Sequence, residues 1–394
     1  MRRRSPQERR RASTPQLSLG LRPHPPNPSC SVFKTGSTLK LFTSKFFPAE
    51  MQLGALLSDT RSMRPRRQVL SGGIYEICMR TARGLPFAVT EYMSLIIRGI
   101  IGRVQRDHKV DLIHDVFMAN HAHLLIRALD RDACKRFYGE VQKQLTDAIK
   151  RLTGKKHLNL WRRNSTSVVR YGDIAAVQRR IAYIFANPAR ANLVDSIGDY
   201  PGISSYRAFL IAPHSIDAEV TESCPWIQAP TIRHLPALSV TSRQDRFITE
   251  RMRQEASLSH DLIRKPNVWM EYFGITDPGE IAWINQEIKR IHLEFEAEAR
   301  ELRRLKGWKV MGRSKLLRES INLTYAPPKS LRIFVYAVDR LTRMRMIWEY
   351  RDFCERCRRC YERWVQGDFT VAWPAGAYPP APPVNRNYLA TALN

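Results

Sequence analysis

The sequence predicts an α+β fold in which antiparallel strands carry helices on one face, followed by a mainly helical region. Between residues 65 and 210, stretches of alternating apolar and polar residues are interleaved with stretches of helical periodicity. Two of the predicted strands follow each other across a tight connection, which requires antiparallel pairing. Farther along, residues 280–372 hold two long helical patterns.

The first elements alternate between strand and helix. Residues 72–81 alternate as a strand, and residues 90–104 carry apolar side chains at helical spacing behind a threonine that can cap the helix. Residues 110–118 and 121–127 are then two strands joined at Ala119-Asn120.

The next elements are predicted by their caps. Residues 132–152 have helical spacing and end before Gly154, and a basic loop follows at residues 155–163. Asp173 then begins a helix, which Pro188 is expected to perturb or end.

Composition shifts suggest five segments along the chain. We expect a disordered basic segment at 1–64, the α+β domain at 65–210, an irregular linker at 211–279, a basic helical extension at 280–372 and a proline-rich tail at 373–394. Because the folded pattern begins just after Met63, we also expect Met63 to be the true translation start.

The charge balance indicates a nucleic-acid partner. The 394 residues include 64 Lys and Arg against 37 Asp and Glu, a net charge of +27. Such an excess favours contact with phosphates, and a merely solvated basic surface or an anionic membrane are the alternatives. No apolar run approaches the ~20 residues that a membrane span requires, so we expect no membrane partner.

The cysteines and the N-terminus favour a reducing cytoplasm, and we expect a bacterial, nucleoid-associated protein. Seven cysteines are an odd number, spread along the chain rather than arranged as a disulfide framework. The arginine-rich start lacks the apolar core of a secretory signal. Cys354, Cys357 and Cys360 have helical spacing without a nearby fourth ligand, which argues against structural zinc.

Two histidines form the candidate metal site. His121 and His123 are two residues apart in a predicted strand, so both imidazoles project from one face while apolar side chains cover the other. Imidazole pairs suit first-row divalent ions, and an added amide oxygen completes a site that also accepts Mg²⁺ or Mn²⁺. Packing or hydrogen-bonding histidines are the alternative.

Tyr183 and Asn187 are the candidate nucleophile and third ligand. They are four residues apart in a predicted helix and therefore lie on one side of it. Because the ordinary pKa of a phenol lies near 10, Tyr183 needs a divalent ion or a local base to act as a nucleophile. The alternatives are a core tyrosine and an asparagine that serves only the end of the helix.

Four ordered blocks resemble the HUH single-tyrosine transposases, and within them the REP-associated tyrosine transposases. The blocks are His121-Ala122-His123, Leu160-Trp161-Arg162, the run from Tyr183 to Val194, and the run from Asp199 to Tyr206. The resemblance covers about residues 65–210. It departs from the family at Gly202, where a tryptophan is common, and at Asn192, where a glycine is usual.

The resemblance implies a ferredoxin-like sheet and a specific chemistry. His121, His123 and Asn187 would bind Mg²⁺ or Mn²⁺, and Tyr183 would attack a DNA phosphate to give a 5′-phosphotyrosine. The expected substrate is single-stranded DNA, beside a hairpin, and a homodimer is the simplest assembly. Two alternatives stay open: a catalytically silent DNA-binding protein of transposase descent, and an HUH relaxase or replication-initiator nickase.

Basic residues between the two motifs are candidates for DNA binding. They offer phosphate contacts and, through the tryptophan, a stacking surface. The set comprises Lys155, Lys156, Trp161, Arg162, Arg163, Arg170, Arg179 and Arg180.

Overall fold

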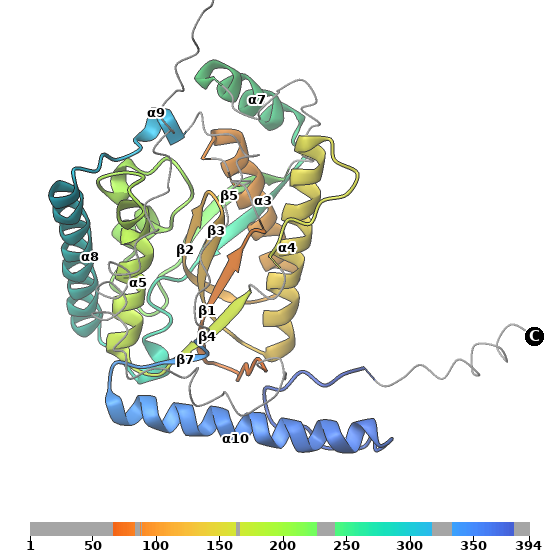
Figure 1. Ribbon diagram of the computed structural model, residues 1–394. Coiled ribbons are helices and arrows are strands. Elements are labelled where there is room, and N and C mark those ends of the chain that lie inside the picture. Colours follow the sequence, from red (N-terminus) through yellow and green to blue (C-terminus); the bar gives the residue numbers. More distant parts are fainter. Residues whose placement is uncertain are drawn as a thin grey trace, which may run out of the picture. The chain divides into compact units, whose positions relative to one another are not determined.

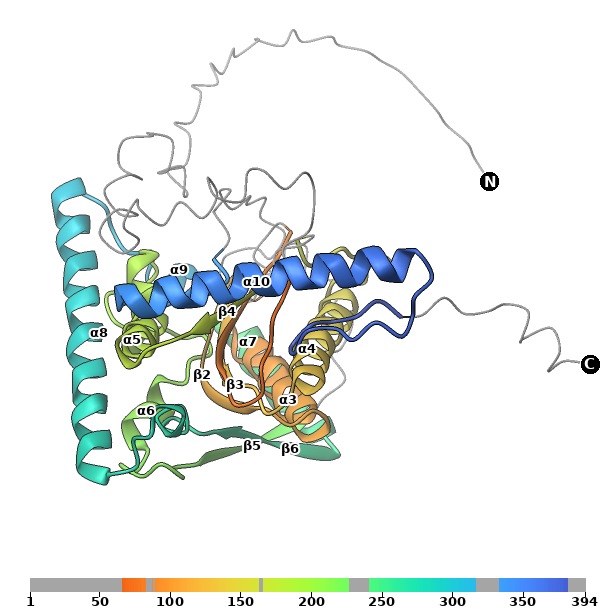
Figure 2. The ribbon, with the colours of Figure 1, turned by 90° about the horizontal axis from the view of Figure 1, so that it is seen from below.

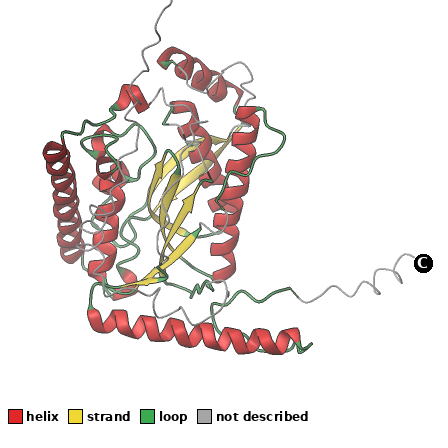
Figure 3. Ribbon diagram, in the orientation of Figure 1, coloured by secondary structure: helices red, strands yellow, loops and turns green. Residues whose placement is uncertain are grey.

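A mixed sheet lies between two helical layers, so the protein belongs to the α+β class (Figures 1 and 3). The computed structural model describes residues 66–82, 87, 89–162, 166–226, 241–316 and 333–381. Within these residues seven strands have the order β5-β6-β2-β3-β1-β4-β7. The expected disorder of residues 1–64, and Met63 as the start, lie outside the described residues.

The four central strands have the predicted ferredoxin-like arrangement. Neighbours in the order β2-β3-β1-β4 pair antiparallel, with α3 between β1 and β2 and α4 between β3 and β4. The bounds are β1 Ile74–Arg80, α3 Glu91–Asp107, β2 Asp111–Met118, β3 His121–Arg127, α4 Arg131–Thr153 and β4 Ser167–Tyr171.

Helices α3 and α4 cover one face of this sheet. The hydroxyl of Thr90 caps α3 by accepting the N–H of Met93, as expected, and Gly154 ends α4 in the left-handed conformation. Their buried sides pack on Ala122, Leu124 and other residues of the same sheet face. The predicted helical layer on one face is therefore present, but helices are not confined to it, because α5 of the same domain packs on the other face.

Helices α5 (Ile174–Arg190) and α8 (Pro278–Lys306) cover the opposite face (Figure 1). The two helices pack along each other, and residues such as Phe185 of α5 and Ile288 of α8 share one core cluster with Leu125 of β3. Pro188 does not end α5, because it stands in the last turn and the helix continues to Arg190. The first of the two long helices predicted within residues 280–372 is thus part of the second layer.

Residues 211–279, expected to be an irregular linker, contain two strands of the sheet. β5 (Val220–Trp226) and β6 (Leu258–Arg264) pair antiparallel, and β6 meets β2 in parallel. The guanidinium of Arg264 donates to Asp115 of β2 at 2.7 Å, and both side chains are buried. Helix α7 (Ser242–Glu255) lies between the two strands in the chain and packs on α3.

The last elements attach to the other edge of the sheet. β7 (Val335–Tyr336) pairs in parallel with β4, and α10 (Arg340–Val365) lies across that end of the molecule (Figure 2). Asp339 caps α10, while its own N–H donates to Asp173, the N-cap residue of α5. The shorter elements are the 3₁₀ helices Ile197–Asp199 and Glu271–Phe273, α6 Tyr206–Ile211 and α9 Arg313–Leu316.

Asn192 and Gly202, the two positions that depart from the resemblance, are each explained by their local structure. Asn192 has a φ of +58°, a left-handed conformation that asparagine tolerates better than most residues, which suits a position where glycine is usual. A Cβ at Gly202 would come within 2.5 Å of the Tyr200 ring. That ring is fixed because the Tyr200 hydroxyl donates to the carbonyl of Phe117 at 2.7 Å.

No described helix is both long enough and apolar enough to span a bilayer.

Candidate functional site

The two histidines lie on the sheet face that α5 covers. His121 and His123 alternate along β3 with Ala122 and Leu124, whose side chains face the α3–α4 layer. The centroids of the two imidazole rings are 5.0 Å apart and the rings are nearly perpendicular. The strand therefore places both rings together at the start of β3.

Each imidazole is oriented by an oxygen at Nδ1. The Nδ1 of His121 is 2.7 Å from Oδ1 of Asn120, and the Nδ1 of His123 is 2.6 Å from Oε1 of Glu76. Because a carboxylate and an amide oxygen only accept hydrogen bonds, Nδ1 of each ring carries the proton and donates. The Nε2 lone pair of a neutral ring is then available to an ion, as in carboxylate–histidine–metal arrangements.

Burial and nearby charges shift the pKa values of the two imidazoles in opposite directions. Burial, together with the charges of His123 and Arg80, holds the pKa of His121 well below 6.5, so this ring is neutral. Burial would also lower the pKa of His123, but the neighbouring Cys78 and Glu76 outweigh it and raise that pKa.

Glu76 is a buried carboxylate at the centre of this site. Its side chain is 4% exposed, and besides His123 it accepts hydrogen bonds from Arg180 of α5 and from the hydroxyl of Tyr171. Burial would raise the pKa of Glu76, but Arg180 and His123 outweigh it and hold the pKa well below its usual range. Glu76 is therefore a carboxylate at neutral pH.

Tyr183 of α5 lies against the histidine pair. The centroid of its ring is 6.3 Å from that of His123, with the two rings nearly perpendicular. Two guanidinium groups flank the same ring, that of Arg180 at 4.4 Å and that of Arg190 at 5.4 Å from the centroid. Tyr183 is half-buried, so its phenol is not sealed in the core. The phenol therefore lies beside the histidines, with cations next to it.

Asn187 lies one turn farther along α5, on the Tyr183 side of the helix. Its side chain is buried, and its Nδ2 has no hydrogen-bond partner among the described residues. Nowhere in the described part of the chain do three His, Cys, Asp or Glu side chains gather to hold a metal. Because Nδ2 is a donor, the amide oxygen of Asn187 would have to be the ligand. Two imidazoles and an amide oxygen are a donor set that Mg²⁺ or Mn²⁺ accepts.

The predicted DNA-binding residues fall into several environments. Lys155, Lys156 and Arg179 are exposed, and Arg162 is half-buried. Arg180 belongs to the site itself through Glu76 and Tyr183. Arg163 lies outside the described residues.

Trp161 is engaged in packing. Its Nε1–H lies 3.0 Å from both the carbonyl of Gln142 and the hydroxyl of Thr146, and its ring packs on Phe87 at 5.6 Å. The tryptophan of the second sequence block thus ties its loop to α4.

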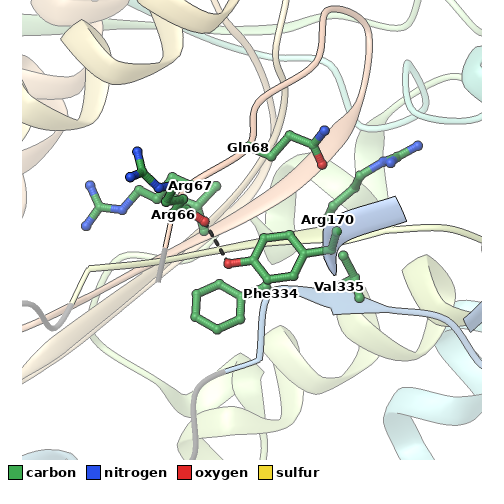
Figure 4. A pocket seen from close by; sticks show the side chains of 8 residues that line it. Arg66, Arg67, Gln68, Arg170, Phe334 and Val335 are labelled. Carbon is green, nitrogen blue, oxygen red and sulfur yellow. Dashed lines mark hydrogen bonds between the residues drawn. The ribbon is translucent and has the colours of Figure 1, made fainter. Parts of the chain in front are cut away.

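Arg170 is engaged with the C-terminal region. Its Nη1 is 3.3 Å from Glu349 of α10, and its side chain lines a small hollow beside β4 and β7 (Figure 4). Arg66 and Phe334 line the same hollow, which includes neither the histidine pair nor Tyr183. This arginine therefore joins the sheet edge to α10.

Comparisons with known proteins give one distant structural match. No model of a protein family matches the chain, and no curated protein matches it. A solved structure of a REP-associated tyrosine transposase bound to a REP hairpin matches 38% of this chain and 86% of its own chain. The match has 21% sequence identity and a TM-score of 0.32, which does not by itself establish a shared fold or function.

Glu76 is the site residue that sequence reasoning missed. It stands in a buried strand whose only other charged residue is the terminal Arg80, and a carboxylate in the middle of such a strand is a usable signal. The signal does not show that His123 is the partner of Glu76. That contact depends on the register of β1 and β3, which pairs His123 with Cys78, two residues from Glu76 on the same strand face.

Proposed function

We propose that this protein is a metal-dependent DNA transposase that cleaves and rejoins single-stranded DNA through a 5′-phosphotyrosine on Tyr183. The observation that carries the proposal is the placement of the Tyr183 ring 6.3 Å from His123, between two guanidinium groups. A tyrosine, a neighbouring histidine pair and flanking cations form a site that suits phosphoryl transfer.

The chain's own residues account for the covalent step. The phenol oxygen of Tyr183 attacks phosphorus, a tyrosyl–phosphate bond forms, and the bond from phosphorus to the 3′-oxygen of the preceding nucleotide breaks. The phenolic proton is lost and the released 3′-oxygen gains one, so the step is balanced. Arg180 and Arg190 lie where they can stabilise negative charge on the phenol and the phosphate.

The reverse step needs no separate source of energy. A free 3′-hydroxyl can attack the phosphotyrosine, which restores the DNA bond and the phenol without ATP. His121, His123 and Asn187 would hold the Mg²⁺ or Mn²⁺, which when bound polarises the scissile phosphate. The excess of cationic residues favours a DNA substrate, and we extend the proposal to a hairpin-containing single strand and to a homodimer.

The test is a covalent adduct between the protein and DNA. The full chain is incubated with Mn²⁺ and a labelled pool of single-stranded hairpins with varied flanks, and labelled protein is detected after denaturation. We expect an adduct in the wild type and none in Tyr183→Phe. The matched control is Tyr361→Phe on α10, an exposed tyrosine outside the site, which should retain the adduct.

Two outcomes contradict the proposal. An adduct that persists in Tyr183→Phe would assign the nucleophile elsewhere. Tight binding of the hairpins by the wild type, with no adduct for any flank, would favour the catalytically silent DNA-binding protein.

A further inference from the structure

We infer that Glu76 is a positioning residue that couples the metal-binding imidazole of His123 to the helix that carries Tyr183. The inference rests on the proposed function and deepens it, because it assigns a role to a residue that contacts neither DNA nor the ion. It follows from the hydrogen bonds that converge on one carboxylate.

Glu76 connects three elements of the site. From β1, its carboxylate accepts the Nδ1–H of His123 on β3 at 2.6 Å and the hydroxyl of Tyr171 on β4 at 2.9 Å. It also accepts an N–H of Arg180 on α5, whose guanidinium lies 4.4 Å from the Tyr183 ring centroid. One side chain thus fixes the ligand ring on one side and the cation beside the nucleophile on the other.

The carboxylate suits this position because only donors surround it. A buried charge is costly unless it is paired and fully hydrogen-bonded, and here Arg180 supplies the opposite charge while three donors occupy the two oxygens. His123 and Arg180 share the oxygen Oε1, whereas Oε2 faces only the hydroxyl of Tyr171. A glutamine can keep its oxygen toward His123 and Arg180 and turn its NH₂ group to that hydroxyl, which can accept a hydrogen bond. It removes the negative charge, however, so the imidazole and the guanidinium lose their charge-assisted bonds and should be held less firmly.

Weaker bonds to these two groups should change metal binding as well as stability. Loss of such a carboxylate partner typically weakens metal affinity by 10–100-fold, since the ligand ring is no longer held in one tautomer and orientation. We expect Glu76→Gln and Glu76→Asp to weaken Mn²⁺ binding by at least about 10-fold. Aspartate keeps the negative charge, but its shorter side chain holds the carboxylate farther from His123 and Arg180.

Two control variants separate this role from a merely structural one. Tyr171→Phe removes one donor and leaves the contacts of Glu76 with His123 and Arg180, so its Mn²⁺ affinity should stay within about twofold of the wild type. Asp111→Asn removes a comparably buried carboxylate, paired with Arg127 at the far end of β3, and should lower stability without changing Mn²⁺ affinity.

The experiment measures Mn²⁺ binding to the full-length variants by calorimetry, with urea unfolding of each variant alongside. Weak binding by both Glu76 variants, with wild-type affinity in Asp111→Asn, supports the inference. If the wild type binds Mn²⁺ and folded Glu76→Gln or Glu76→Asp binds it equally well, the inference is wrong and the proposed function is untouched. If the wild type binds no Mn²⁺, the metal-dependent function fails instead.

Discussion

Shortening Ile288 of α8 should destabilise the whole sheet domain. The side chain is fully buried and belongs to the core cluster that joins α8 to Phe185 of α5 and Leu125 of β3. Ile288→Ala removes three buried carbon atoms, and such changes cost about 2–5 kcal/mol when the cavity does not collapse. For a domain of this size, we expect the free energy of unfolding to fall by about 3 kcal/mol and Tm by roughly 5–10 °C.

The assay is urea and thermal unfolding followed by far-UV circular dichroism, with Leu293→Ala as the matched control. Leu293 is on the same helix but is 47% exposed, so its truncation should change the free energy of unfolding by less than about 0.5 kcal/mol. The reasoning is refuted if Ile288→Ala matches this control. It is also refuted if only one helix melts early while the remaining transition is unchanged, since α8 would then be an independent appendage.

Three further predictions concern stability and pH. Burial holds the pKa of His114 at about 3, against 6.5 when unfolded, so the unfolded chain binds more protons between these values and stability is lost as pH falls below 6.5. In His114→Phe, the fall in unfolding free energy between pH 7 and pH 5 should be about 2 kcal/mol smaller than in the wild type, and equal falls would contradict this. Asn192→Gly should leave urea stability within about 1 kcal/mol, whereas Asn192→Val should lower it by more, because glycine and asparagine tolerate a φ of +58° and a β-branched residue does not. Trp161→Ala should cost about 3 kcal/mol of stability, and a stable variant with weakened affinity for single-stranded DNA would instead assign this ring to stacking.

The local pattern of the sequence predicted the central fold well. The strands that carry Glu76 and His123 follow from alternation, and the helix that begins behind Asp173 follows from its cap and periodicity. These features depend on neighbouring residues, so a single sequence displays them. β5 and β6 were missed because their faces are mostly half-exposed and a proline interrupts the first of them.

The candidate site was predictable as a list of chemical groups. Two histidines on one strand face, and a tyrosine one turn before an asparagine, follow directly from residue spacing. Their arrangement in space was not predictable, because the ring of Tyr183 meets that of His123 only after α5 packs on the sheet face opposite α3 and α4. Trp161 shows the same limit, since the sequence gives its aromatic character and not its partners in α4.

The sequence by itself determined the order of strands and helices from β1 to α5 and the strand face that the two histidines share. Only the tertiary structure decided that Glu76 orients a histidine 47 residues away, and that Arg264 reaches an aspartate 149 residues away to join the late strands to the sheet. The physical reason is that spacing along a strand or helix is fixed by backbone geometry, whereas contacts between distant segments depend on register and on the packing of the whole core.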